Sequence, residues 1–100
     1  MSIYLMLTTL TDEGRKALQE DPEMIREINR EVEHMGVKIV DQYAVLGQYD
    51  FVNILEAPSN EAMVKLATRL SAKGNFQTLT LAAITIDALI KTLKQKETPW

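Results

Sequence analysis

The chain has 100 residues, a net charge of −3 and no cysteine. This length fits one domain with one modest core, and the lack of cysteine excludes disulfides, thiol nucleophiles and zinc–thiolate sites. The apolar runs are too short for a membrane helix and no secretory signal is visible, so we expect a cytoplasmic protein with no membrane partner.

The first part of the chain predicts a strand followed by two helical segments. Residues 2–10 alternate two side-chain sets, as a strand does. Thr11-Asp12-Glu13 has the form of a helix start, although Gly14 predicts that this helix is short. Asp21-Pro22 predicts the start of a second helix. Its apolar stripe at helical spacing is Ile25, Ile28, Val32 and Met35, and Gly36 predicts its end.

The middle of the chain predicts a β-hairpin. Residues 37–46 and 49–56 are rich in strand-forming side chains. Gly47-Gln48 separates them, and glycine at the first position fits a two-residue type II′ turn. We therefore take Gly47 as a structural turn residue.

The last part predicts a helix, a strand and another helix. Ala57-Pro58-Ser59 precedes a helical stripe that ends at Gly74-Asn75, and residues 76–84 form the fourth strand. The short C-terminal helix has the stripe Ile86, Leu89, Ile90 and Leu93. The order is that of a ferredoxin-like α+β fold, β-α-β-β-α-β, with a four-stranded antiparallel sheet, helices on one face and an extra C-terminal helix. We expect one domain at 1–97 and a tail at 98–100 that includes Pro99 and Trp100.

In this topology two helices cover one face of the sheet and leave the other open. We assign five apolar residues to the helix-covered face: Ile3, Leu5, Leu7, Val52 and Ile54. The open face would then be mixed, with Tyr4, Met6, Thr8, Phe51, Asn53 and Leu55. Because so large a patch usually marks an interface, we expect the chain to bind itself through it, as a homodimer or larger ring. The alternative is that the C-terminal helix folds back over this face.

The hairpin carries a family resemblance. Gly47-Gln48-Tyr49-Asp50, followed by the strand sequence FVNILEAP, resembles the signature of the GYD domain family. The likeness extends over roughly residues 2–90 and includes Leu10 to Gly14, Glu61 with Ala62, and Gly74-Asn75 with Thr78 and Thr80. It implies a ferredoxin-like fold related to the dimeric α/β-barrel proteins rather than a particular activity.

The same hairpin is similar to the ligand-binding domain of leucine-responsive and AsnC-type regulators. Those domains assemble as dimers and rings and bind small effectors between subunits. Because these 100 residues contain no helix-turn-helix, that likeness implies a stand-alone sensor module. Only Lys91, Lys94 and Lys96 form a basic cluster, too few for useful phosphate affinity, so we expect no nucleic-acid partner.

Candidate ligand-binding residues are the polar side chains near the expected open face and the hairpin. A phenol and a carboxylate at Tyr49 and Asp50 are suited to a polar ligand or to proton transfer, or else Asp50 holds the turn backbone. A few polar groups in an apolar surface are typical of small-ligand pockets, although they also fit an interface core. The full set is Tyr4, Thr8, Tyr43, Tyr49, Asp50, Asn53 and Thr80.

The sequence gives no catalytic constellation. His34 is the single histidine, placed at a helix end where a solvated capping role is expected, so we predict no metal site and no cofactor. We therefore favour a small-molecule-binding or sensing module acting as a homo-oligomer. The alternatives are a cofactor-independent enzyme of the dimeric α/β-barrel type, which is less favoured, and a purely structural assembly protein.

Overall fold

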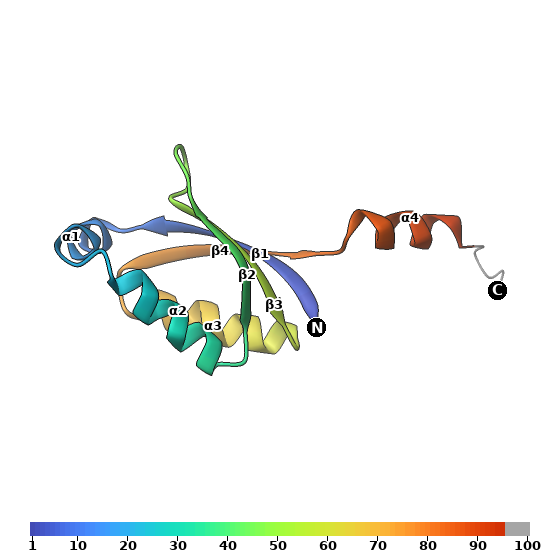
Figure 1. Ribbon diagram of the computed structural model, residues 1–100, viewed down its shortest axis with the longest axis horizontal. Coiled ribbons are helices and arrows are strands. Elements are labelled where there is room, and N and C mark those ends of the chain that lie inside the picture. The colour runs from blue at the N-terminus through green and yellow to red at the C-terminus, as the bar shows by residue number, and fades with distance from the viewer. Residues whose placement is uncertain (96–100) are drawn as a thin grey trace.

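The computed structural model describes residues 1–95 and has four strands in one antiparallel sheet (Figure 1). This confirms the predicted α+β, ferredoxin-like class with its extra C-terminal helix. The predicted tail, with Pro99 and Trp100, lies outside the described residues. The elements are β1 (Ser2–Leu10), α1 (Asp12–Glu20), α2 (Met24–His34), β2 (Lys38–Ala44), β3 (Phe51–Ala57), α3 (Asn60–Ala72), β4 (Phe76–Ala83) and α4 (Ile86–Lys94).

The sheet order is β2-β3-β1-β4, so the first and third strands are central, as predicted. Helices α2 and α3 lie side by side below the sheet in Figure 1, and the opposite face has no helix over it. Helix α4 continues from β4 beyond the end of the sheet. The alternative in which this helix folds back over the open face is therefore not the observed arrangement.

Helix α1 is nine residues long despite its glycine. Thr11 caps it by accepting a hydrogen bond from the Gly14 N–H at 3.0 Å, and the Thr11 N–H donates to the Asn75 carbonyl. Gly14 is buried, and a Cβ there would lie 2.1 Å from the Asn75 carbonyl oxygen. The glycine is thus needed for close approach between α1 and the start of β4.

Helix α2 begins at Met24, two residues later than Pro22, where the sequence predicted it. The Asp21 carboxylate accepts a hydrogen bond from the Glu23 N–H and forms a turn of its own before the helix. The other end is as predicted: Gly36 has φ +81, and the Val37 N–H donates to the Val32 carbonyl. This pattern closes the helix in a Schellman motif.

The predicted two-residue turn between β2 and β3 is wrong. Strand β2 ends at Ala44, β3 begins at Phe51, and the six residues 45–50 connect them. The Asp50 N–H donates to the Thr8 carbonyl on β1, which draws the base of the hairpin toward β1. Gly47 lies within the connection at φ +115, a conformation that favours glycine.

The assignment of the sheet faces was inverted. Strand register places Tyr4, Met6 and Thr8 of β1 on the face that α2 and α3 cover, together with Asn53 and Leu55 of β3. The side chains predicted to lie under the helices are instead on the open face: Ile3, Leu5, Leu7, Val52 and Ile54. Strand β1 is apolar on both sides, so its alternation alone does not say which side the helices cover.

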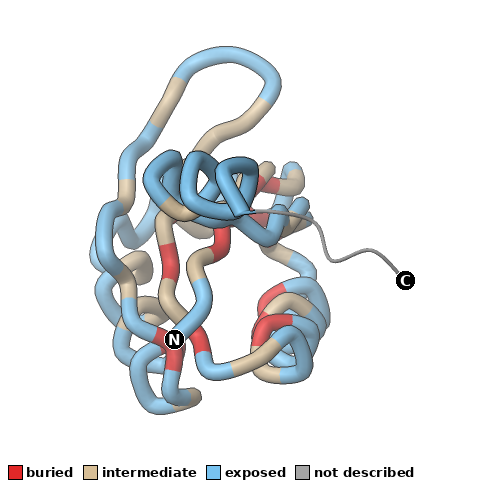
Figure 2. Tube along the Cα trace, turned by 90° about the vertical axis from the view of Figure 1, so that its right-hand side faces the viewer, coloured by how far each residue is buried: buried red, intermediate tan, exposed pale blue. Residues whose placement is uncertain are grey.

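The core lies between the helix layer and the covered face. Tyr4, Met6 and Leu55 from the sheet pack with helix residues such as Met63 and Leu66. In Figure 2 the buried segments follow the strands and the inner side of α3, whereas α4 is exposed along most of its length. The core therefore belongs to the sheet, α2 and α3, and α4 contributes no buried residue to it.

Candidate functional site

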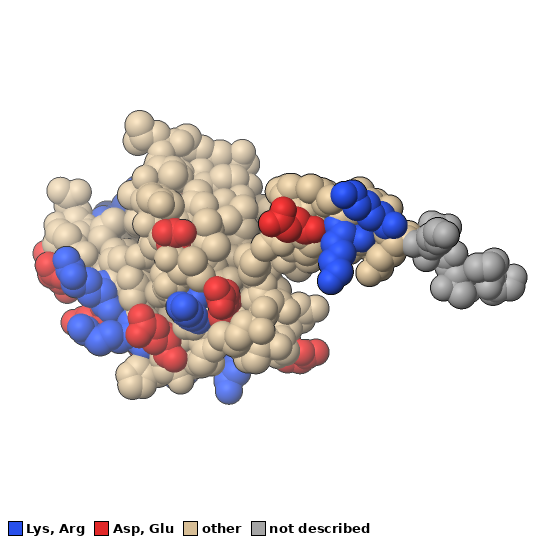
Figure 3. All heavy atoms as spheres, turned by 45° about the vertical axis from the view of Figure 1, so that its right-hand side comes forward, with Lys and Arg blue, Asp and Glu red and all other residues tan. Residues whose placement is uncertain are grey.

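The open face of the sheet carries a row of apolar side chains on the three strands β3, β1 and β4. Its central residues, Leu5 and Leu7, pair with Ile54 and Val52 on β3 and with Leu81 and Leu79 on β4. Leu79 and Leu81 are each 45% exposed. In Figure 3 charged side chains gather on the lower body and on α4, and the upper body is largely uncharged. A contiguous apolar surface of this kind usually marks a protein interface.

Helix α4 presents a second apolar surface. Thr85 caps the helix through the Ala88 N–H, and its stripe falls at the spacing i, i+3, i+4, i+7. Four side chains of that stripe are exposed on the isolated chain: Ile86, Leu89, Ile90 and Leu93. An amphipathic helix normally forms by burying its apolar stripe, and residues 1–95 do not supply α4 with the contact that its pattern requires.

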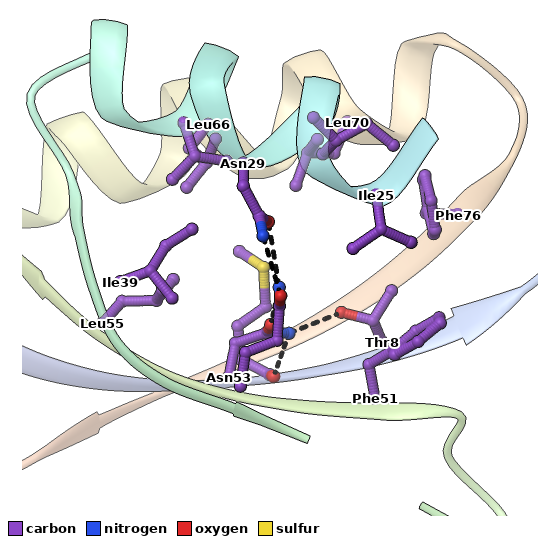
Figure 4. A pocket seen from close by; sticks show the side chains of 14 residues that line it. Thr8, Ile25, Asn29, Ile39, Phe51, Asn53, Leu55, Leu66, Leu70 and Phe76 are labelled. Carbon is purple, nitrogen blue, oxygen red and sulfur yellow. Dashed lines mark hydrogen bonds between the residues drawn. The ribbon is translucent and has the colours of Figure 1, made fainter. Parts of the chain in front are cut away.

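A network of amide side chains runs from α2 into the covered face of the sheet (Figure 4). Asn29 and Gln42 exchange two hydrogen bonds, of 2.8 and 3.0 Å. Gln42 also donates to Asn53 at 2.8 Å. Asn53, in turn, donates to the Met6 carbonyl and to the Thr8 hydroxyl. The buried polar groups of this network therefore satisfy one another.

The space around this network is small. Apolar side chains from α2, α3 and the sheet surround the amides, and they leave a cavity of about 50 Å³. A small-molecule site usually needs about 300 Å³ or more, whereas one water occupies about 30 Å³. The cavity therefore fits an ordered water, and the network serves mainly to fix Gln42 of β2 and Asn53 of β3 in register.

The hairpin residues Tyr49 and Asp50 lie apart from this network. The Asp50 carboxylate accepts a hydrogen bond from the Leu10 N–H at 2.8 Å, and its backbone also bonds to Thr8 and Val45. These contacts connect the hairpin to the end of β1 and support the structural role for Asp50. An open hollow of about 530 Å³ lies beside it and includes Arg15 of α1.

The remaining candidates fall in two further places. Tyr43 is 58% exposed and lies on the open face, opposite Val52. Tyr4 and Thr80 lie on the covered face and line one hollow of about 270 Å³ beneath α3. The seven predicted residues thus do not form one site, but they include two pairs that share a space: Thr8 with Asn53, and Tyr4 with Thr80.

Sequence reasoning missed Asn29, Gln42 and Asn60. Gln42 bonds to the predicted Asn53, and Asn60 bonds to the predicted Tyr4. Asn29 bonds to Gln42. Asn29 sits on a helix stripe otherwise made of apolar residues, between Ile25 and Val32. An amide inside an apolar stripe is the signal that should have pointed to a buried polar partner.

Charged groups contribute little to these sites. Glu31 at the end of α2 pairs with Lys73 after α3, and the hydrogen bond from Lys73 lowers the pKa of the Glu31 carboxyl from 4.5.

Among residues 1–95 no group of three or more histidine, aspartate or glutamate side chains is placed to hold a metal ion, and His34 is exposed at the end of α2. No described helix is long and apolar enough to span a membrane.

The contacts at the hairpin base and at Gly14 involve residues that carry the resemblance to the GYD domain family. Comparison with known proteins supports the same family. The profile of the GYD domain matches residues 4–93. The chain belongs to the GYD domain family. A relative from Thermus thermophilus, named the glutamine synthetase and cystathionine beta-lyase binding protein, is 44% identical over 95 residues, which are 94% of this chain and 100% of that protein.

Solved structures share the fold of this GYD domain at lower identity. The FFRP-DM1 crystal structure superposes with a TM-score of 0.57 and 20% identity, covering 84% of this chain and all of that one. The leucine response regulatory protein LrpA of Mycobacterium tuberculosis gives a TM-score of 0.52 at 16% identity, over 84% of this chain and 51% of that one. TTHA0845 of Thermus thermophilus gives a TM-score of 0.54 at 20% identity, over 85% of this chain and 95% of that one.

Proposed function

We propose that this GYD domain is a cytoplasmic binding module that acts as a homo-oligomer through the open face of its sheet. The observation that carries the proposal is the apolar character of that face, where Leu5, Leu7 and Leu81 lie among other aliphatic side chains. Leaving this surface in water is unfavourable by roughly 25 cal/mol for each Å². A second copy placed face to face would cover it.

The module would also bind other proteins. The Thermus relative is named for binding glutamine synthetase and cystathionine beta-lyase. Because that relative is 44% identical to this chain, we propose a metabolic enzyme as the partner class here too. The apolar stripe of α4 would suit such a partner or the second copy, because none of its side chains is buried in the part of the chain that the structure describes.

A small-molecule or sensing role is the second function that we propose, supported by the hollow that contains Tyr4 and Thr80. The enzyme hypothesis has less support. The side chains that an enzyme would use do not meet in one place. Asn53, Tyr4 and Asp50 line three separate spaces, and Tyr49 lies in the hairpin connection. Asp50 is already engaged with the backbone of β1.

The test of assembly is analytical ultracentrifugation over a concentration series. The wild-type chain is expected to sediment as a dimer or larger ring. Leu81→Asp should weaken self-association by roughly 100-fold or more, because a carboxylate would be buried without a partner. Leu46→Asp, an equal change at the exposed hairpin tip, is the matched control and should leave association unchanged.

A monomeric wild type at the highest concentration, or equal behaviour of the two variants, would refute assembly through this face. Binding of purified glutamine synthetase from the same organism is measured on the same three proteins by biolayer interferometry. Loss of enzyme binding in Leu81→Asp alone would show that the assembled form is the one that binds.

A further inference from the structure

The hollow beneath α3 is separate from the open face and from the amide network. It has a volume of about 270 Å³ and lies between α3 and the side of the sheet where the central strand β1 pairs with the edge strand β4. Met63, Val64 and Ala67 of α3 form one wall, and Ala82 lies on the other side. This volume is close to the lower limit for small-ligand pockets.

Thr80, one of the residues that line the hollow, carries an unexplained polar group. Its hydroxyl oxygen is buried and, among the described residues, is the single buried side-chain oxygen or nitrogen that lacks a hydrogen-bond partner. A buried hydroxyl without a partner is unfavourable by about 1–3 kcal/mol. Valine has almost the same shape and suits a strand equally well, so a threonine here calls for a partner beyond those that residues 1–95 supply.

A second polar group faces the same space from the neighbouring strand. Tyr4 is 3% exposed, and its hydroxyl donates to the Asn60 side-chain carbonyl at the start of α3. Its oxygen still has lone pairs to accept with, and the exposed Asn60 carries an amide NH₂ donor. Tyr4 pairs with Ala82 and Met6 with Thr80, so Tyr4 and Thr80 are diagonal neighbours, roughly 7 Å apart at Cβ.

The chemistry of the lining selects the ligand. None of the described residues that line the hollow is charged, and a charged ligand would lose its hydration without gaining an ion pair from them. A primary carboxamide is neutral and carries both a donor and an acceptor, which match the Thr80 hydroxyl and the Tyr4–Asn60 pair. A short hydrocarbon chain would contact Met63 and Val64.

We propose that the hollow bounded by Tyr4, Asn60 and Thr80 binds a small, uncharged molecule with a carboxamide head and a short apolar body. This inference rests on the small-molecule part of the proposed function and names its site and ligand class. It does not depend on assembly, because every residue of the site belongs to one chain.

The experiment is a heteronuclear NMR titration of the whole chain with butyramide as the probe and butyrate as its charged counterpart. Butyramide should cause saturable shifts at Ala67, Thr80 and Ala82, with a dissociation constant on the order of millimolar for so small a ligand. Butyrate should bind at least tenfold more weakly. Thr80→Val should weaken butyramide binding about tenfold or more, because the head loses a hydrogen bond.

Thr78→Val is the matched control. Thr78 is the next residue along β4 on the same face, is half-buried as Thr80 is, and does not line the hollow. The ligand-free Thr80→Val protein should also melt at a higher temperature than Thr78→Val, because it loses an unpaired buried hydroxyl. Equal weakening in the two variants, equal binding of butyrate, or no saturable shift would overturn the proposal.

A lower melting temperature for Thr80→Val would also overturn it, because the hydroxyl would then have a partner, such as an ordered water, in the free protein. Sedimentation of the same samples separates this result from the proposed assembly. Failure of the titration with intact oligomers removes the carboxamide site alone, and saturable binding by a monomer removes assembly alone.

Discussion

The two faces of the sheet are stabilised in different ways: the covered face combines an apolar core with buried polar groups, whereas the open face is apolar and uncovered. The covered face holds Thr8, Asn53 and Gln42 beneath the helices, whereas the open face holds Leu5, Leu7 and Leu81. The covered face tolerates these three polar groups because each of them finds a hydrogen-bond partner, whereas the Thr80 hydroxyl on the same face has none among the described residues. The open face has no such compensation within the chain, since aliphatic groups gain only from being covered.

This difference indicates what each face is for. The covered face uses directional bonds that fix one arrangement of β1, β2, β3 and α2, and it contributes to the stability of the single chain. The open face contributes little until another molecule covers it. Substitutions on the two faces should therefore be detected by different measurements.

The largest effect on the stability of the chain is expected from Asn53→Ala. This change removes bonds to Gln42, Thr8 and the Met6 carbonyl, and it leaves buried donors and acceptors without partners. We expect the free energy of unfolding to fall by about 2–3 kcal/mol, measured by urea denaturation. Gln48→Ala, in the exposed hairpin connection, is the control and should change it by less than about 0.5 kcal/mol.

A loss below about 1 kcal/mol for Asn53→Ala would mean that water replaces the missing amide in the adjoining cavity. The two faces would then differ less than the hydrogen bonds indicate. Sedimentation of Asn53→Ala should match that of the wild type, because the side chain lies on the face away from the proposed interface.

The sequence predicted the order of the elements well, because turn residues, helix stripes and strand composition are local signals. Gly36 ends α2 where expected, since its positive φ is a local requirement. The faces of the sheet were predicted wrongly because β1 is apolar on both sides. Which side the helices cover is decided by pairing between distant residues, such as Asn29 with Gln42.

The residues of the candidate site were predicted only in part, because the site also depends on contacts between residues distant in the sequence. Tyr4 and Thr80 were both named from the sequence, but their common hollow requires Asn60 and Met63 from α3, which only the packing brings together. The role of Asp50 was open between ligand and structure, and its bond to the Leu10 N–H depends on a contact between residues forty positions apart. Such contacts leave no local pattern to read.

A smaller effect on the single chain is expected from Leu93→Ser on α4. Leu93 is 75% exposed, so the free energy of unfolding of the monomer should change by less than about 0.5 kcal/mol, whereas self-association or enzyme binding should weaken. Lys91→Ser, on the charged side of the same helix, should change neither. Urea denaturation at low concentration and sedimentation at high concentration separate the two effects. A loss of about 2 kcal/mol or more in the monomer would mean that α4 packs against its own chain.

A similarly small effect on the single chain is expected from Lys73→Ala, which removes the ion pair between the helices on the covered side. Both partners are well exposed, with side chains 39% and 47% accessible, so solvent screening should keep the loss below about 1 kcal/mol at pH 7. Because Lys73 lowers the pKa of Glu31 in the folded chain, its stabilisation is complete above the ordinary value of 4.5 and is lost as the pH falls through the lowered value. The gap in unfolding free energy between wild type and Lys73→Ala should therefore close in acid, whereas Lys65→Ala on the same helix should show no such convergence. A gap that persists at low pH would mean that Lys73 acts through its hydrocarbon stem, and the helix layer would then rest on apolar contacts in the same way as the open face.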